Sequence, residues 1–133
     1  GLSDITIKNM SLLNYYPGMT KKTMFGGIMG DGGTVGIKRL LIDNCTIESG
    51  GSFNINKMYN SKISNNLIIG REWTPASFGN SYMNIFTGNS IDGRNKDGKR
   101  GGYRGFNFNL TPTWGGFKPT AMNYIARNDT QYI

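Results

Sequence analysis

The sequence predicts an all-β protein built as a parallel solenoid of about five to six coils. Two observations predict this fold class: a short phrase recurs along the chain at spacings in the low twenties, and the composition favours strands and turns. A repeat of this length is typical of one coil of a β-solenoid, in which each coil packs only on its neighbours.

The composition disfavours helices. The 133 residues include 20 Gly and 16 Asn but only three Ala. Gly loses much backbone entropy in a helix and Asn competes for backbone hydrogen bonds, whereas both tolerate the left-handed backbone angles that turns need. We expect a single domain over residues 1–133. The opening Gly-Leu-Ser-Asp, without Met, leads us to expect a fragment of a longer chain.

The repeated phrase begins with an apolar residue, followed by a polar one, then Asn or Gly, then two residues and a second apolar residue. It occurs at residues 7–12, 42–47, 63–68 and 86–91, with starts separated by 35, 21 and 23 residues. Strand alternation predicts that the first residues point inward and stack on one another. These residues are Ile7, Ile42, Ile63 and Phe86.

The other positions of the phrase have equally specific expectations. The second residues point outward, and they are Lys8, Asp43, Ser64 and Thr87. The third residues form a sharp corner in the left-handed conformation, and they are Asn9, Asn44, Asn65 and Gly88. The last residues start the next inward column, and they are Leu12, Ile47, Ile68 and Ile91.

Three segments interrupt the repeat and are predicted to be surface loops, the usual place for binding groups. They are residues 15–36, 71–80 and 93–105, and the pattern weakens after Pro112. An ordinary antiparallel β-domain with Asn-rich turns remains an alternative, because short strands with Gly and Asn turns also suit sandwiches.

The phrase Ile-x-Asn-x-x-Ile, with coils of 21–23 residues, resembles right-handed parallel β-helix proteins of the pectin-lyase-like class, and within it bacteriophage tailspikes and appendages. The resemblance covers residues 2–92 and includes no catalytic motif of the family. It implies a right-handed parallel β-helix (solenoid) and a homotrimeric, extracellular virion protein. Such a protein binds or degrades cell-surface polysaccharide during host attachment.

The charge balance favours anionic partners. Fifteen Lys and Arg against eight Asp and Glu give a net charge of +7, which suits nucleic acid, acidic glycans or a membrane surface. No apolar run approaches the length of a membrane-spanning helix, so we expect no membrane insertion. With no His and a single Cys, we expect neither a metal site nor a cofactor, and Cys45 is expected to be a packing residue.

Carboxylates are the candidates for catalysis, because glycoside hydrolysis needs two of them. The repeat places Glu48 and Asp92 at the same offset two coils apart, with Ile69 between them, and Glu72 lies on a nearby loop. Backbones two strands apart are separated by roughly 10 Å, close to the roughly 6.5–9.5 Å of inverting enzymes. The competing interpretation is that all three are solvated surface carboxylates.

Aromatic and basic residues on the loops are the candidates for substrate binding. Aromatic rings suit sugar faces and a basic loop suits acidic polymers, although core packing and a solvated loop explain them as well. The candidates are Arg71, Trp73, Tyr82, Arg94, Lys96, Tyr103 and Arg104.

Three functional hypotheses follow. The first is a tailspike or appendage segment that binds cell-surface polysaccharide, with depolymerase activity (hydrolase or lyase) left open, and that associates as a homotrimer or with the rest of its parent chain. The second is a non-catalytic structural or assembly β-helix of a virion appendage. The third is a basic nucleic-acid-binding module.

Overall fold

The computed structural model of the chain is all-β with parallel strands. It describes residues 2–14, 29–31, 35–49, 53–70, 76–94, 106–109 and 122–131, which contain 17 strands and no helix. Accordingly, no helix in these ranges is long and apolar enough to cross a membrane. The antiparallel alternative is wrong for the described strands, because every pair that they form is parallel.

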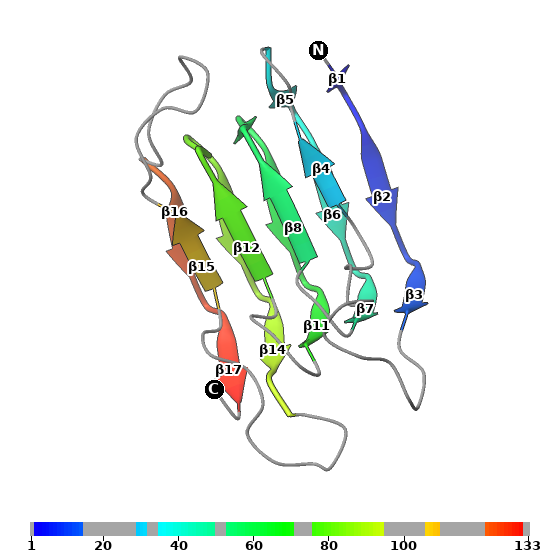
Figure 1. Cartoon of the computed structure of the whole chain (residues 1–133). Coiled ribbons are helices and arrows are strands. Elements are labelled where there is room, and N and C mark those ends of the chain that lie inside the picture. Colours follow the sequence, from blue (N-terminus) through cyan, green and yellow to red (C-terminus); the bar gives the residue numbers. More distant parts are fainter. Residues whose placement is uncertain are drawn as a thin grey trace, which may run out of the picture.

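The strands form four sheets, named here A to D (Figure 1). Sheet A consists of β1 (Leu2–Ser3), β5 (Ile37–Lys38) and β9 (Met58–Tyr59). Sheet B consists of β2 (Thr6–Lys8), β6 (Leu41–Asp43), β10 (Lys62–Ser64), β13 (Ile85–Thr87) and β16 (Tyr124–Ala126). Sheet C consists of β3 (Ser11–Asn14), β7 (Thr46–Ser49), β11 (Leu67–Gly70), β14 (Ser90–Asp92) and β17 (Asp129–Gln131). Sheet D consists of β4 (Met29–Asp31), β8 (Phe53–Asn56), β12 (Ala76–Gly79) and β15 (Phe106–Asn109).

The chain passes through the sheets in the order A, B, C, D and then returns to A. One such passage is called a circuit below. Strands β5 to β8 belong to the second circuit and β9 to β12 to the third, and each strand pairs only with strands of adjacent circuits. The first circuit (β1 to β4) and the fifth (β16 and β17) therefore lie at opposite ends of the row of strands (Figure 1).

The inward-facing residues of sheet B form the apolar column that the repeat predicts. Ile63 of β10 pairs in register with Ile42 of β6 and with Phe86 of β13, and all three side chains are 0% exposed. Burying an aliphatic or aromatic side chain of this size contributes about 1.5–3 kcal/mol. The prediction that these residues share one inward column is confirmed.

Sheets C and D close the core from the other sides. Ile68 of β11 pairs with Ile47 and Ile91 in the second predicted column, which is confirmed. In sheet D, Phe78 pairs with Ile55, and its ring packs against the Phe86 ring with centroids 4.7 Å apart. The core is therefore a continuous apolar interior shared by successive circuits.

The predicted corner residues adopt the left-handed conformation between sheets B and C. Their φ angles are 55° at Asn9, 53° at Asn44, 56° at Asn65 and 66° at Gly88. At Gly88 a Cβ atom would lie 2.6 Å from Oδ1 of Asn65 in the circuit below. Gly adopts this φ without strain, and a side chain there would force the carboxamide of Asn65 to shift.

Further left-handed residues mark two more corners that the sequence analysis did not identify. Those between sheets A and B are Asp4, Arg39, Asn60, Met83 and Met122, each five residues before the corner between B and C. Those between sheets D and A are Gly36, Lys57 and Asn80, each three residues earlier still. The number of residues between these corners is therefore the same in each circuit where they are described. Equivalent positions of successive circuits are 35, 21, 23 and 39 residues apart, so the variation lies in the rest of each circuit.

Two ladders of hydrogen-bonded side chains run through the interior beside these corners. The B–C ladder consists of Asn66, Asn89 and Asn128, and the A–B ladder consists of Ser61, Asn84 and Asn123. In the B–C ladder, Oδ1 of Asn89 accepts from the backbone N–H (3.1 Å) and the side-chain N–H (2.9 Å) of Asn66. Asn66 and Asn89 are 2% and 1% exposed, so these bonds satisfy groups that have no access to water.

The loop predictions and the end of the repeat need correction. β4 lies inside the segment 15–36 and β12 inside the segment 71–80, so part of each is strand. After Pro112, where the repeat weakens, β16 and β17 extend sheets B and C by another circuit. Residues 15–28, 32–34, 71–75 and 95–105 lie outside the described residues.

Candidate functional site

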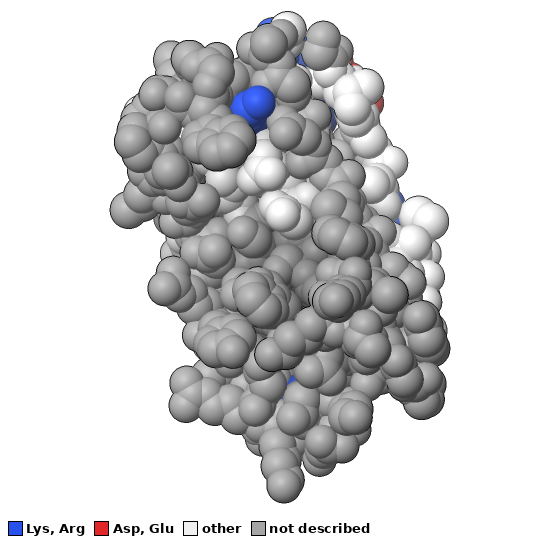
Figure 2. All heavy atoms as spheres, viewed as in Figure 1, with Lys and Arg blue, Asp and Glu red and all other residues white. Residues whose placement is uncertain are grey.

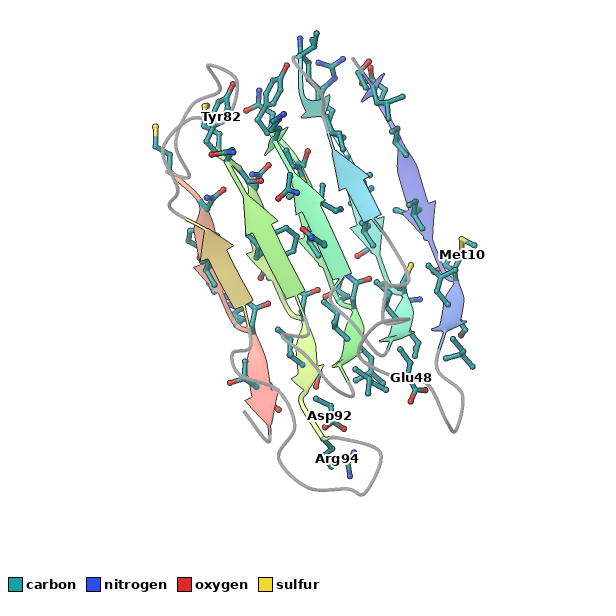
Figure 3. All side chains as sticks on the ribbon, in the orientation of Figure 1. Met10, Glu48, Tyr82, Asp92 and Arg94 are labelled. Atoms are coloured by element: carbon teal, nitrogen blue, oxygen red, sulfur yellow. The ribbon has the colours of Figure 1, made fainter. Side chains whose placement is uncertain are left out.

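Glu48 and Asp92 lie in one row on the outer face of sheet C. Ile69 pairs in register with Glu48 on one side and with Asp92 on the other, as the repeat predicts. Because Ile47, Ile68 and Ile91 point inward, strand alternation directs this row outward. Figure 3 shows both carboxylates on the same side of the molecule. The two backbones are separated by two strand spacings, about 10 Å.

Asp92 is engaged by Arg94, which follows two residues later. Its Oδ1 accepts from the Arg94 backbone N–H at 2.9 Å, an Asx turn that directs the chain out of β14. The Arg94 guanidinium also donates to both carboxylate oxygens, with Nε 3.0 and 2.8 Å from Oδ1 and Oδ2. The Asp92 residue is only 7% exposed. The Arg94 guanidinium therefore holds the Asp92 carboxylate through charge-assisted hydrogen bonds.

Glu48 differs from Asp92 in its surroundings. It is partly buried between Leu13 of β3 and Ile69 of β11 in the outward row. Leu13 is 66% exposed, so the row continues into an apolar surface toward the first circuit. The structure thus brings two of the three predicted catalytic residues into one row. The third, Glu72, lies outside the described residues.

A second group of outward residues lies on sheet A. Ser3, Lys38 and Tyr59 pair in register, and an isolated parallel bridge adds Tyr82. The Tyr59 and Tyr82 rings are stacked, with centroids 5.1 Å apart and planes 1° from parallel. Nζ of Lys38 lies 5.4 Å from the Tyr59 centroid, within the range of a cation–π contact. Lys38, Tyr59 and Tyr82 are called the aromatic row below.

Tyr82 and the carboxylates do not form one site. Figure 3 shows Tyr82 on the side of the molecule away from Glu48, Asp92 and Arg94, because it follows the corner between sheets D and A. Tyr82 was predicted from the sequence as a binding residue, whereas Tyr59 and Lys38 were not. The signal that could have found them is the offset of 23 residues between the two tyrosines, the same as between Asn66 and Asn89.

An ion pair lies beside the aromatic row at the corner between sheets A and B. Arg39 donates to both Asp4 oxygens, with Nε–Oδ1 at 2.5 Å and Nη2–Oδ2 at 2.6 Å. The hydrogen bond from Arg39 is the main cause that lowers the Asp4 pKa from 3.8 to about 2. The pair links the first two circuits on an exposed surface, where such pairs contribute little to stability.

A polar cluster on the outer face of sheet B is structural. Oδ1 of Asp43 accepts from Oγ of Ser64 (2.7 Å) and Nδ2 of Asn65 (2.9 Å). The hydrogen bond from Ser64 is the main cause that lowers the Asp43 pKa, followed by the one from Asn65. Nζ of Lys8 lies 3.7 Å from Oδ2 of Asp43. Ser64 is only 1% exposed although its row faces outward, so this cluster covers the strand and offers no open site.

Several predicted binding residues lie outside the described residues. They are Arg71, Trp73, Lys96, Tyr103 and Arg104. The described residues contain no group of three or more His, Cys, Asp and Glu side chains that could hold a metal ion. Most of the face in Figure 2 belongs to residues that the structure does not describe. The candidate residues that it does describe lie on the outer faces of sheets A and C.

Comparisons of the chain with protein-family models, with curated proteins and with solved structures found no match. The resemblance to pectin-lyase-like proteins therefore remains a prediction from the repeated phrase. The candidate functional surfaces of the described residues are the aromatic row on sheet A and the row of Glu48 and Asp92 on sheet C.

Proposed function

We propose that the chain is a segment of right-handed parallel β-helix from a bacteriophage tailspike or related virion appendage, and that it binds cell-surface polysaccharide on its outer surface. Four parallel sheets visited in a fixed order, with circuits of 21 and 23 residues in the middle, support the β-helix part of the proposal. Extracellular location on the virion and assembly as a homotrimer belong to the same proposal.

The observation that carries the binding proposal is the aromatic row. Tyr59 and Tyr82 are partly exposed and held parallel by the register of successive circuits, so their positions are fixed before any ligand arrives. Rigid tyrosines combine apolar ring area with a hydroxyl group, a combination that suits sugars, and they lose little conformational entropy on binding. Lys38 adds a positive charge at one end of the row.

An anionic polysaccharide fits this surface better than a neutral one. The chain carries a net charge of +7, which raises the local concentration of anionic polymers. Lys38 then provides a local contact for a sugar carboxylate beside the rings.

The test is binding of the whole chain to polygalacturonate and to dextran, an anionic and a neutral polysaccharide, measured by titration calorimetry. Tyr82→Ala and Lys38→Ala should each weaken binding to polygalacturonate about tenfold, equivalent to about 1.4 kcal/mol. Lys62→Ala is the matched control, because it removes the same charge from an exposed position on sheet B. Equal affinities for Lys38→Ala and Lys62→Ala, together with an unchanged Tyr82→Ala, would show that the aromatic row is not the binding site.

Cleavage of the bound polysaccharide is a second candidate function, favoured by the shared row of Glu48 and Asp92. For cleavage, a polysaccharide bound at the aromatic row would have to extend round the molecule to sheet C. Otherwise a polysaccharide would have to bind separately at sheet C. New reducing ends or unsaturated products after incubation with polysaccharide would establish it, and their absence would leave a binding or purely structural role.

A further inference from the structure

The two interior ladders have a direction. In each, a side-chain oxygen of one circuit accepts from the circuit before it, and the carboxamide N–H groups of Asn66, Asn84 and Asn89 donate both backward and forward. Asn84 shows the full pattern: Oδ1 accepts from the Ser61 backbone (3.0 Å), and Nδ2 donates to the carbonyl of Met58 and to Oδ1 of Asn123 (both 3.0 Å). Asn89 repeats it with Asn66, Ile63 and Asn128.

The ladders stop at the fifth circuit with donors still facing forward. Asn123 and Asn128 each accept from the circuit before and donate one Nδ2–H back to it, to the carbonyls of Ser81 and Phe86 (both 2.9 Å). Among the described residues, nothing accepts the second Nδ2–H or the backbone N–H of either Asn. The edge formed by β16, β17 and these two residues is called the C-terminal edge below.

This edge is open to solvent in the structure. Ile125 continues the inward column of sheet B after Phe86, yet it is 48% exposed whereas Phe86 is 0% exposed. Its neighbours Tyr124 and Met122 are 61% and 77% exposed. An inward column that ends half in water, beside unpaired donors, is a surface that a further circuit would complete.

The opposite edge, at β1 to β3, has no matching acceptors. The ladder positions of the first circuit are Ile5 and Met10, the residues after the left-handed Asp4 and Asn9. Neither side chain accepts hydrogen bonds well. A second copy stacked head to tail would therefore leave two backbone and two side-chain N–H groups of the C-terminal edge without partners, and buried donors without partners are strongly disfavoured.

We propose that the C-terminal edge is a docking surface for one kind of partner: a parallel β-circuit that carries carboxamide side chains at two positions five residues apart. The spacing is that of Asn84 and Asn89 and of Asn123 and Asn128, set by the corners between sheets A, B and C. The edge rejects the first circuit of another copy, so the chain does not grow into open-ended filaments. This inference rests on the ladders and is independent of polysaccharide binding.

The first experiment supplies the missing acceptors. In Ile5→Asn/Met10→Asn, two carboxamides at the opposite edge match Asn123 and Asn128 of a second copy. Sedimentation velocity should show open-ended oligomers whose mass grows with concentration, at least tenfold more at a given concentration than for the unaltered chain. Adding Asn123→Leu/Asn128→Leu should abolish this growth, and the control Ile5→Leu/Met10→Leu should behave like the unaltered chain. A folded Ile5→Asn/Met10→Asn variant that does not polymerise, or head-to-tail filaments of the unaltered chain, would overturn the proposal.

The second experiment uses the unaltered chain and does not depend on a variant that folds. Two synthetic peptides correspond to residues 81–92, with Asn84 and Asn89 at the ladder positions, and to residues 2–13, with Ile5 and Met10 there. The first should bind at least tenfold more tightly and should shift the backbone and side-chain amide NMR signals of Asn123 and Asn128. Equal binding of the two peptides, or no binding by either, would contradict the proposed recognition.

Discussion

At the scale of single residues, the chain turns at the left-handed corner residues, and these differ in type from circuit to circuit. Asn and Gly occupy the left-handed conformation at little cost, whereas a longer side chain there costs roughly 1–2 kcal/mol. Met83 and Lys57 nevertheless occupy it, with φ of 55° and 58°. Since the backbone bonds of each corner to the next circuit are repeated, the stacked circuits compensate for this local strain.

Gly88→Ala tests the corner conformation. Its φ of 66°, together with the shift that a Cβ 2.6 Å from Oδ1 would force on Asn65, predicts a loss of about 1–2 kcal/mol in the free energy of unfolding. Met83→Gly, at the other corner of the same circuit, should be neutral or stabilising because it relieves left-handed strain. Urea denaturation of both variants measures the difference. Equal stabilities would show that the corner geometry is not a constraint.

The Asp4–Arg39 pair predicts a pH effect of defined sign. Because the Asp4 pKa is lowered from 3.8 to about 2, the contribution of the pair is present above pH 3.8 and is lost as the pH falls toward 2. NMR titration of the Asp4 carboxyl should give a midpoint near 2, and Arg39→Ala should return it toward 3.8. High salt should reduce the shift, since both side chains are exposed. A midpoint that Arg39→Ala leaves unchanged would contradict the pairing.

At the scale of elements, the ladders replace apolar packing at two interior positions of each later circuit. Asn89 is 1% exposed and satisfies two N–H donors of Asn66 as well as the carbonyl of Ile63. Its removal leaves several buried polar groups without partners, and each costs about 1–3 kcal/mol.

Asn89→Leu is therefore expected to reduce the free energy of unfolding by at least about 3 kcal/mol, measured by urea denaturation. Cys45→Ala is the control at the same ladder position in the second circuit, where only two long Sγ contacts of 3.4 and 3.7 Å are lost. The free energy of unfolding should fall much less in Cys45→Ala than in Asn89→Leu. If the two variants lose equal stability, the ladder is not a separate source of stability.

The row of sheet C leads to a prediction about cleavage. If the chain cleaves polysaccharide through this row, Glu48→Gln should reduce turnover by about two orders of magnitude or more and leave binding nearly intact, because the amide keeps the shape and loses the proton chemistry. Asp92→Asn should lower turnover too, and also the thermal stability, because it weakens the contacts with Arg94. Full turnover in both variants would exclude the row as a catalytic site.

The sequence predicted the parts of the fold that repeat with one-residue accuracy. The inward Ile42, Ile63 and Phe86 and the left-handed Asn44 follow from strand alternation and turn preference, so the phrase alone placed them. It missed the circuit at 122–131, because Arg127 occupies the corner where Asn or Gly was expected. The ladder residue Asn128, aligned with Asn66 and Asn89, was the better signal.

The candidate site was predicted only in part. The register of Glu48 with Asp92 could be counted from the phrase, but the Arg94 contact depends on the turn after β14, which the phrase does not cover. Likewise, the stacking of Tyr59 on Tyr82 depends on a corner whose left-handed residues, Lys57 and Asn80, share no residue type. Spacing predicts which residues share a row, whereas their partners depend on the local turn.

At the scale of the whole molecule, each described strand pairs only with strands of the circuits before and after it, so stability accumulates from neighbour to neighbour. Strands β10 and β11 of the third circuit pair with a strand on each side, whereas β1, β16 and β17 pair on one side only among the described strands. Backbone amides of β10 and β11 should therefore show the slowest hydrogen exchange, and those of β1 and of β16 and β17 the fastest. Uniform protection across all circuits would indicate a single cooperative unit instead.

The constant spacing between the corners determines where a circuit tolerates a change of length. Five residues always separate the corner between sheets A and B from the corner between B and C, while whole circuits differ from 21 to 39 residues. The differences in length therefore lie in the remaining part of each circuit, where they disturb neither ladder. A longer or shorter loop in that part would change the outer surface without changing the register of the strands in sheets B and C.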